Sequence, residues 1–382
     1  MRGAARTPSP VAAWTAALLL ALCSALAGAQ ERLGSYRIDP GKVSVSGISS
    51  GAFMANQVHI AHSELIMGAG LVAGGLYGCA VWRVDAEVPR LDATISRAFD
   101  RCMEARAPLD PASSFAARVA SLAGAGLIDS PTALAGDKVY LFTGRADSVV
   151  DPATVVRAAE LYRALGVAEG DLRLQKFLDP PVPADRGAGH AWVTDDCCQA
   201  CAANASPYIN DCGYDQAGAI LSHIYGELSP EAETLSGAFL PFSQREFAPD
   251  GEAAVNGLAE RGVVYVPETC AAGETCALHV ALHGCAQSAE VLGDTFYKSI
   301  GLNEWADSNR MVVLYPQAAK LERSTLDAAF PDRIFRNAIA VNPHGCWNWW
   351  GYGYDDRFAL KDGAQVGAIR GMIARIMGDD PD

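Results

Sequence analysis

The chain has 382 residues, of which 50% are hydrophobic, 19% charged and 8% aromatic, and its 44 acidic residues outnumber its 30 basic ones. This composition is typical of a soluble globular protein rather than a disordered chain. The net charge of −14 argues against nucleic acid and anionic membrane surfaces as partners, because both attract basic patches, and it favours an uncharged substrate.

The first 29 residues are predicted to be a secretion signal and not part of the fold. Two arginines precede an apolar stretch over residues 11–26, and the small residues 27–29 then suit a signal peptidase. A membrane anchor is the alternative, but the stretch is shorter than the roughly 20 residues that a spanning helix needs. We therefore expect an exported protein, extracellular or periplasmic, with residues 30–382 forming a single catalytic domain.

The cysteines support export. One of the 11 cysteines, Cys23, lies in the signal, and the even number that remains is typical of disulfides in an oxidising compartment. The sequence leaves the pairing open, although Cys270 and Cys276 flank a short loop and could pair locally. The alternative is a metal site formed by Cys197, Cys198, Cys201 and Cys212. No histidine or second paired spacing accompanies these four, so disulfides are favoured and no metal is expected.

After the signal, β-prone runs alternate with helical patterns. A glycine-containing turn follows the first run, and a helical pattern continues through Ile60. Helical spacing also covers residues 152–165. The strands predicted here cover residues 43–45, 65–72, 138–144 and 172–177. Such alternation predicts a parallel sheet with helices on its faces.

The pattern begins again beyond residue 260. The further predicted strands cover residues 262–267, 276–282 and 311–316. Residues 229–261 are the nearest thing to a connection between the two parts, and they carry no strong change in composition. One α/β domain without an appended binding module is the simpler interpretation.

Ser49 is the candidate nucleophile. It lies at the centre of Gly47-Ile48-Ser49-Ser50-Gly51, which matches the G-x-S-x-G nucleophile elbow. The match alone is weak, because glycine- and serine-rich chains produce it by chance. The predicted strand before it and the predicted helix after it are the context that the motif requires.

A catalytic serine needs an imidazole base and a carboxylate that orients this base. In α/β-hydrolases they follow in the order Ser, Asp, His. Asp147 comes directly after the predicted strand 138–144, and His190 lies on a glycine-flanked loop further along. Asp151 is the rival carboxylate, for which a helix N-cap is the alternative role. His344 is the reserve base.

The site also needs backbone N–H groups for the oxyanion. Ser50 supplies one by position, and His283-Gly284-Cys285 at the end of a predicted strand resembles the loop that supplies the other. In most α/β-hydrolases that loop precedes the nucleophile, whereas here it follows, and few residues of the mature chain precede Ser49. A circular permutation explains both observations, with the permuted segment covering about residues 260–382.

Residues 346–354 concentrate three tryptophans and two tyrosines beside glycines. Core packing is the usual role of aromatic side chains. Because the aromatic residues are closely spaced and lie beside glycines, a cleft wall or an exposed adhesive patch is as well supported as core packing. The candidate substrate-binding residues are Trp347, Trp349, Trp350 and Tyr352.

These segments together resemble the secreted poly(3-hydroxybutyrate) depolymerases with a circularly permuted α/β-hydrolase fold, which are related to polyhydroxyalkanoate and feruloyl-type esterases. The resemblance spans most of the mature chain. The segments that carry it are 47–54, the Asp147 loop, 189–192, 282–285 and 342–350.

The resemblance implies a triad of Ser49, Asp147 and His190, and an oxyanion hole from the backbone of Ser50 and Cys285. It also implies that Trp347 lines the substrate cleft and that no cofactor is needed. A disulfide between Cys285 and Cys346, which would tie the aromatic loop to the oxyanion loop, is a further hypothesis.

The expected function is hydrolysis of ester bonds in poly(3-hydroxybutyrate) or its oligomers through an acyl-enzyme. An esterase for feruloyl or acetyl groups on plant polysaccharide, with the same triad, is the nearest alternative. A non-catalytic polymer binder that uses the aromatic strip for contact is the alternative from another class. In the absence of a separate binding domain, we expect adsorption to polymer granules through exposed apolar residues of the catalytic domain.

Overall fold

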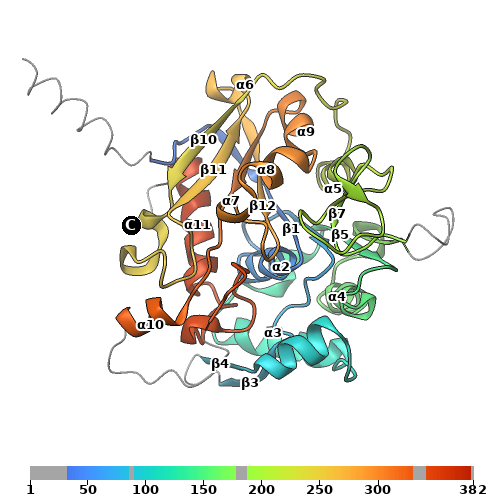
Figure 1. The fold of residues 1–382 in the computed structure, drawn as a ribbon, viewed down its shortest axis with the longest axis vertical. Coiled ribbons are helices and arrows are strands. Elements are labelled where there is room, and N and C mark those ends of the chain that lie inside the picture. Colours follow the sequence, from blue (N-terminus) through green and yellow to red (C-terminus); the bar gives the residue numbers. More distant parts are fainter. Residues whose placement is uncertain (1–31, 86–89, 178–186, 330–340, 380–382) are drawn as a thin grey trace, which may run out of the picture. The chain divides into compact units, whose positions relative to one another are not determined.

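The centre of the fold is an eight-stranded, mostly parallel sheet (Figure 1). The computed structural model describes residues 32–85, 90–177, 187–329 and 341–379, so the predicted secretion signal lies outside the described residues. All seven strands predicted from the sequence belong to this sheet. In spatial order, the strands are β10 (Ala238–Ser243), β11 (Arg261–Val266), β13 (Met311–Tyr315), β12 (Cys276–Leu282), β1 (Ile38–Ile48), β2 (Gly68–Val72), β5 (Lys138–Gly144) and β6 (Leu172–Phe177).

The strand order reveals a rearranged connectivity. If the chain is followed from β10 through β13 and then from β1 to β6, the strands occupy the sheet in the order 1-2-4-3-5-6-7-8. β11 runs antiparallel to both of its neighbours, and the pairs from β13 to β6 are parallel. In this renumbered order the strands follow one another across the sheet with a single exchange of neighbours. The polypeptide itself, however, begins at the fifth strand, as the predicted permutation requires.

One strand was not predicted. Residues 229–261 were expected to be a connection, but the structure places the edge strand β10 within them. Its first four residues are not buried and it contains Pro241, so it lacks a clear alternation of apolar and polar residues. A proline is tolerated at a sheet edge because its missing N–H would have no partner there.

Alternate residues of the strands face two separate cores. In β5, Val139 and Leu141 belong to the first core, whereas Tyr140 and Phe142 belong to the second. The long helices that contribute to the first core are α2 (Ser50–Ala61), α3 (Ala112–Gly124), α4 (Pro152–Ala164) and α11 (Ala364–Met377). Those of the second core are α5 (Gln216–Tyr225), α8 (Thr295–Ser299) and α9 (Leu302–Ser308). The sheet is thus covered on both faces, as the alternation of strands and helices predicted.

Several short elements connect these layers. β3 (Val81–Asp85) pairs with β4 (Arg90–Ala93), and β7 (Trp192–Thr194), β9 (Ile209–Asp211) and β8 (Gln199–Ala200) form a three-stranded sheet. A π-helix covers Arg97–Met103. The remaining short α-helices are α6 (Glu268–Ala271), α7 (Ala289–Leu292) and α10 (Arg323–Ala329). No helix among the described residues has the length and apolar character to cross a bilayer.

The ten cysteines among the described residues form five disulfides. They join Cys79 to Cys102, Cys197 to Cys198, Cys201 to Cys212, Cys270 to Cys276, and Cys285 to Cys346. The local pair and the bridge between the oxyanion and aromatic loops are both among them. The four clustered cysteines form two disulfides, and the described residues contain no group of metal-ligating side chains.

Candidate active site

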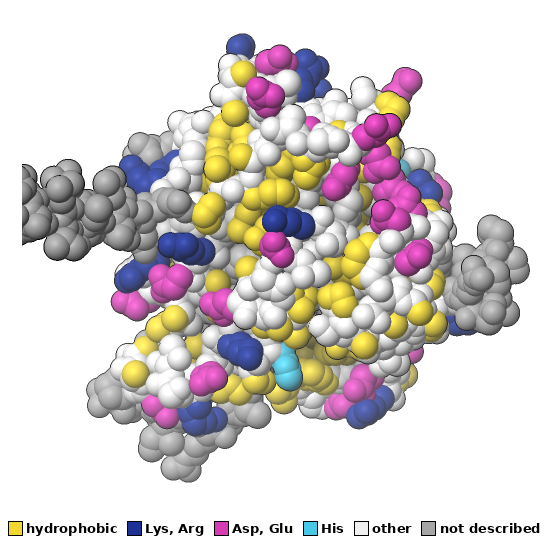
Figure 2. Space-filling view, turned by 45° about the horizontal axis from the view of Figure 1, so that its top comes forward, with side chains coloured by type: hydrophobic (Ala, Val, Ile, Leu, Met, Phe, Trp, Pro, Cys, Tyr) yellow, Lys and Arg dark blue, Asp and Glu magenta, His cyan; other side chains and the backbone are white. Residues whose placement is uncertain are grey.

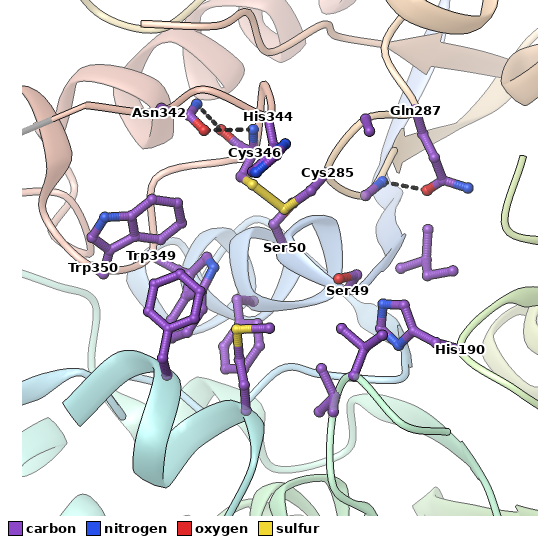
Figure 3. A pocket seen from close by; sticks show the side chains of 18 of the residues that line it. Ser49, Ser50, His190, Cys285, Gln287, Asn342, His344, Cys346, Trp349 and Trp350 are labelled. Carbon is purple, nitrogen blue, oxygen red and sulfur yellow. Dashed lines mark hydrogen bonds between the residues drawn. A yellow bond between two sulfur atoms is a disulfide. The ribbon is translucent and has the colours of Figure 1, made fainter. Parts of the chain in front are cut away.

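One pocket of about 480 Å³ brings the candidate nucleophile, base and oxyanion donors together (Figure 3). Ser49, Ser50, His190 and Cys285 all line it. Ser49 and Ser50 lie where β1 meets α2, and Cys285 follows β12, the neighbour of β1 in the sheet. Figure 3 shows Ser49 and His190 next to each other at one end of the pocket.

The backbone at Ser49 is strained in the way a nucleophile elbow requires. Its φ and ψ are 56° and −122°, a combination that side chains other than glycine rarely adopt. A Cβ atom on Gly47 would lie 2.4 Å from the backbone of Gly51, and one on Gly51 would lie 2.2 Å from the carbonyl oxygen of Leu282. The amide of Ser49 donates to the carbonyl of Val72 at 2.9 Å and holds the turn. Both glycines of the motif are therefore sterically required.

His190 and Asp147 form a buried hydrogen-bonded pair. Nδ1 of His190 lies 2.9 Å from Oδ2 of Asp147, and the side chains are 5% and 0% exposed. The other carboxylate oxygen accepts hydrogen bonds of 2.8 Å from the amides of Val149 and Val150. Because the carboxylate can only accept, Nδ1 carries the proton, and the lone pair of Nε2 is free to take a proton from a hydroxyl.

Asp151 and His344, the alternative candidates for the acid and the base, do not form such a pair. Asp151 is the N-cap of α4, and its side chain accepts a hydrogen bond from the amide of Ala153 at 2.8 Å. His344 lines the same pocket but is exposed, and within the described ranges no carboxylate pairs with it. Only His190 among these pocket histidines has the carboxylate partner that a general base needs.

The peptide group between Gly284 and Cys285 is oriented by His283. Nδ1 of His283 lies 2.7 Å from the carbonyl oxygen of Gly284, and Nε2 accepts a hydrogen bond from the amide of Ala318 at 3.0 Å. Burial lowers the pKa of His283 to about 4, so the ring is neutral at neutral pH. The C=O and N–H of a trans peptide point in opposite directions, so the amide of Cys285 is directed away from His283.

Ser50 supplies the second candidate donor. It is the first residue of α2, so its amide belongs to the helix N-terminus, where N–H groups lack partners within the helix. Within the part of the chain that the structure describes, the amides of Ser50 and Cys285 donate to no protein acceptor. Two N–H groups are thus available beside the Ser49 hydroxyl.

Gln287 and Tyr208 are site residues that the sequence did not indicate. Gln287 is 1% exposed and holds the oxyanion loop, because its Oε1 accepts from the amide of Gly284 at 2.7 Å (Figure 3). Its Nε2 donates to the carbonyl of Pro207 at 2.8 Å. The ring of Tyr208 meets that of His190 edge to face, with centroids 6.0 Å apart. The contacts of Gln287 with Pro207 and of Tyr208 with His190 join separate segments of the chain, so no local pattern marks either residue.

Two of the four candidate substrate-binding aromatic residues line the pocket. Trp349 stacks on Phe53 with ring centroids 4.1 Å apart and an interplanar angle of 12°. Trp350 packs edge to face against Trp349 at 5.4 Å and against Phe99 at 6.3 Å. These rings make one wall of the pocket apolar.

Trp347 and Tyr352 do not line the pocket, contrary to expectation. They are 0% and 1% exposed. The ring of Trp347 lies 5.5 Å from that of His283 and therefore packs behind the oxyanion loop. The hydroxyl of Tyr352 donates to the carbonyl of Cys346 at 2.8 Å. Gly351, at φ 80°, makes a left-handed turn between Trp350, which lines the pocket, and Tyr352, which does not.

Comparison with known proteins gives close relatives but no match to a family-level sequence model. The chain is 36% identical over 372 residues to a poly(3-hydroxybutyrate) depolymerase of Delftia acidovorans, covering 96% of this chain and 66% of that protein. It is 35% identical over 373 residues to a polyhydroxybutyrate depolymerase of Talaromyces funiculosus, covering 96% of each.

Two solved structures are similar to this one. The crystal structure of PHB depolymerase from Penicillium funiculosum matches with a TM-score of 0.73 and 32% identity, covering 92% of this chain and 100% of that one. A serine-to-alanine variant of a PHB depolymerase complexed with an R3HB trimer matches with a TM-score of 0.72, the same identity and the same coverage. With the strand order, this likeness confirms the predicted α/β-hydrolase class.

Proposed function

This chain belongs to the poly(3-hydroxybutyrate) depolymerase family of carboxylic ester hydrolases, and from that premise we propose that it hydrolyses ester bonds of poly(3-hydroxybutyrate) or its oligomers with Ser49 as nucleophile. The observation that carries the proposal is the hydrogen bond of 2.9 Å between buried Asp147 and His190, which lines the same pocket as Ser49. The trimer bound by the similar structure supports a polyester oligomer as substrate.

In the acylation half of the proposed reaction, Oγ of Ser49 attacks the ester carbonyl carbon and His190 takes the hydroxyl proton on Nε2. Asp147 stabilises the imidazolium that forms. The amides of Ser50 and Cys285 donate to the oxyanion of the tetrahedral intermediate, and each such donor contributes about 10²- to 10³-fold to kcat. When the carbon–oxygen bond breaks, His190 returns the proton to the departing 3-hydroxyl group.

In the deacylation half, water replaces the released alcohol. His190 takes a proton from this water, the resulting hydroxide attacks the acyl carbon, and the new tetrahedral intermediate uses the same two amides. Its collapse releases the carboxylic acid, and the proton returns to Ser49. The reaction needs no oxidant or reductant, since it exchanges an ester bond and water for an acid and an alcohol.

The lining of the pocket suits an uncharged, methyl-bearing polyester. Among the described residues that line it there is no Asp, Glu, Lys or Arg, and one wall consists of Phe53, Phe99, Trp349 and Trp350. Burying apolar surface against these rings favours binding without any ionic contact. A charged acyl group would lose hydration in this pocket without gaining a counter-ion.

Exposed apolar residues at the rim support adsorption to solid polymer. Ile95 and Phe99 line the pocket and are nevertheless 37% and 39% exposed. Figure 2 shows one face of the molecule, on which hydrophobic side chains form patches between separate acidic and basic groups. Such patches would contact a polyester surface that carries no charge.

The proposal is tested by Ser49→Ala, with Ser114→Ala on the exposed side of α3 as a control. Turnover of amorphous poly(3-hydroxybutyrate) and of its trimer should fall about 10⁴- to 10⁶-fold in the first variant and stay unchanged in the second. A folded Ser49→Ala protein with normal turnover would refute the assignment. Hydrolysis of feruloyl esters in preference to the polyester would support the carbohydrate esterase instead.

Labelling with a serine-directed organophosphate separates catalysis from mere binding. The parent should take up one label, which peptide mass spectrometry places on Ser49. Polymer binding without labelling would support a non-catalytic binder.

We also propose that residues 1–29 direct export and are removed, leaving residues 30–382 as one catalytic domain. The five disulfides support an oxidising destination. N-terminal sequencing of the protein from an exporting host should begin close to residue 30, and an intact N-terminus would contradict this.

A further inference from the structure

A loop closed by a disulfide lies against the acid and the base of the site. Cys201 and Cys212 are bridged, and the loop between them carries Asn204. The oxygen of the Asn204 side chain accepts from the amide of His190 at 2.8 Å and from the amide of Ser148 at 3.0 Å. Its nitrogen donates to the carbonyl of Ala146 at 2.8 Å. The carboxamide thus touches the backbone on both sides of Asp147 and at the base itself.

The orientation of this carboxamide is determined by its partners. Both groups near the oxygen are N–H donors, and both groups near the nitrogen are carbonyl oxygens, since the nitrogen also donates to Ala202 at 3.2 Å. If the side-chain oxygen and nitrogen of Asn204 were exchanged, the NH₂ group would face two N–H donors and the oxygen would face two carbonyl oxygens. Each of the two polar atoms of Asn204 therefore has two partners in one arrangement.

The backbones of these loops approach closely enough for one short side chain to bridge them. A Cβ atom on Gly144 or on Gly189 would lie 2.1 Å from the carbonyl oxygen of Ala188 or of Ala203, respectively. The amide of Ala146 donates to Ala188 at 2.9 Å. The loops thus pack through backbone, and Asn204 adds a second side-chain link between the acid loop and the base loop, beside the hydrogen bond between His190 and Asp147.

We propose that Asn204 is a positioning residue that fixes Asp147 relative to His190, an inference that rests on the proposed function. A planar amide that bonds Ala146, Ser148 and His190 at once limits the relative motion of the two loops. It thereby keeps the hydrogen bond between His190 and Asp147 short and aligned. Misplacing a catalytic group by about 1 Å costs about 10²-fold in rate, so the effect belongs to kcat.

N-glycosylation is the alternative role for Asn204. Asn204, Ala205 and Ser206 fit the N-x-[ST] acceptor pattern. The nitrogen that would carry the sugar already donates to two carbonyl groups, and the neighbouring oxygen is bonded to the base. These contacts favour positioning over modification.

Asn210 provides a matched control. It lies in the same disulfide-closed loop, and its side-chain nitrogen donates to the carbonyls of Cys201 and Ala203 at 2.9 and 2.8 Å. Among the described residues, the hydrogen bonds of the Asn210 side chain stay within this loop and do not reach the segment of Asp147 or of His190. Asn210→Ala therefore loosens the loop without removing the link between acid and base.

The test compares Asn204→Ala with Asn210→Ala in the full-length mature protein. Asn204→Ala should lower kcat on the soluble trimer about 10- to 100-fold while KM stays within about twofold. In the same variant, the downfield proton resonance of the hydrogen bond between His190 and Asp147 should broaden or move upfield. Asn210→Ala should lower the melting temperature but keep the resonance and retain kcat within about threefold.

Asn204→Asp keeps the test decisive if the alanine variant does not fold. It retains the acceptor for His190 and Ser148 but places an oxygen opposite the carbonyls of Ala146 and Ala202. A loss of kcat and a shifted resonance are again expected. Parent-like kcat, or a loss of kcat with an unchanged resonance, would overturn the proposal.

The resonance is recorded in the Ser49→Ala background as well. This measurement needs no turnover, so it separates the two proposals. If Ser49→Ala keeps its activity, the proposed function fails, whereas the resonance still reports whether Asn204 aligns the two side chains.

Discussion

The side-chain oxygen of Gln287 accepts a hydrogen bond of 2.7 Å from the amide of Gly284. The side-chain nitrogen of Gln287 reaches the carbonyl of Pro207, and the next residue, Tyr208, lies against the ring of His190. A single buried side chain thus joins the loop of the proposed oxyanion donor to the wall beside the base.

Replacing Gln287 by Met should therefore lower kcat about 10- to 100-fold, since the Cys285 amide loses its alignment. The buried amide of Gly284 would also lose its partner, at a cost of about 1–3 kcal/mol in the free energy of unfolding. Gln244→Met is the control, because Gln244 also bonds the backbone of two segments from a buried position elsewhere. Equal effects of both variants on kcat would contradict the prediction.

Gly51→Ala should prevent correct folding of the elbow. The new Cβ would lie 2.2 Å from the carbonyl oxygen of Leu282, which belongs to the adjacent strand and has little room to move. We expect a loss of about 1–3 kcal/mol or more in urea unfolding, together with loss of activity. At Gly124, the last residue of α3, a Cβ meets nothing within 4 Å, so Gly124→Ala should stabilise the protein by about 0.5–1 kcal/mol.

Buried histidines should make the fold sensitive to acid. Burial lowers the pKa from 6.5 to about 4 in His62 and His283 and to about 3 in His279. The contribution of each histidine to the free energy of unfolding is complete above pH 6.5. It is lost as the pH falls from 6.5 towards the folded-state pKa, because over this range the histidine is protonated in the unfolded chain but not in the folded protein.

Each histidine should contribute about 1.4 kcal/mol per pH unit to the slope of unfolding free energy between pH 6 and pH 4.5. His62→Gln should therefore give a shallower slope by this amount in denaturant titrations across that range. A variant curve parallel to that of the parent would show that His62 does not take part.

The disulfides should differ in their contribution to stability. The Cys285–Cys346 bridge closes a separation of 61 residues, whereas the Cys270–Cys276 bridge closes one of 6. Removing each by paired alanine substitutions should cost about 4 and about 2 kcal/mol, respectively, if loop-closure entropy dominates. Only the first pair should also lower kcat, because Cys285 carries the proposed oxyanion donor. Parent-like kcat without the first bridge would contradict this.

Phe99→Ser should weaken the attack on solid polymer more than the attack on soluble ester. Phe99 lies at the pocket and is 39% exposed, so it can contact a polyester surface. Removing one exposed apolar side chain should reduce adsorption to amorphous granules several-fold in a depletion assay. Val291→Ser, at a residue 43% exposed on α7, is the control, and an equal loss of adsorption there would argue against a specific rim.

Most strands of the large sheet could be predicted because their residues follow simple patterns. The predicted bounds of β5, β6 and β12 agree with the structure to the residue. β5 and β12 are short, buried apolar runs that end at turns, and β6, the other edge strand, precedes a proline-rich stretch of the sequence; both signals are local. The edge strand β10 lacks both, since four of its residues are not buried and Pro241 interrupts the run.

The proposed acid, base and nucleophile could be suggested because motif and chain order carry information. Their supporting residues could not. Gln287 and Asn204 bind backbone groups of distant segments, and an amide side chain has no spacing rule for such contacts. Nor could composition tell which rings of residues 346–354 face the pocket, because their neighbours come from distant segments: Trp347 packs near His283, and Trp349 stacks on Phe53.

The moved chain start also has a consequence for biosynthesis. The elbow leaves the ribosome early, whereas β12, which flanks β1 on one side, emerges only in the last third of the polypeptide. A truncated product that stops before Cys276 lacks both that flank and the oxyanion loop. Under the proposed mechanism, a nascent chain that has not yet reached Cys285 should therefore be inactive, although it already carries Ser49, Asp147 and His190.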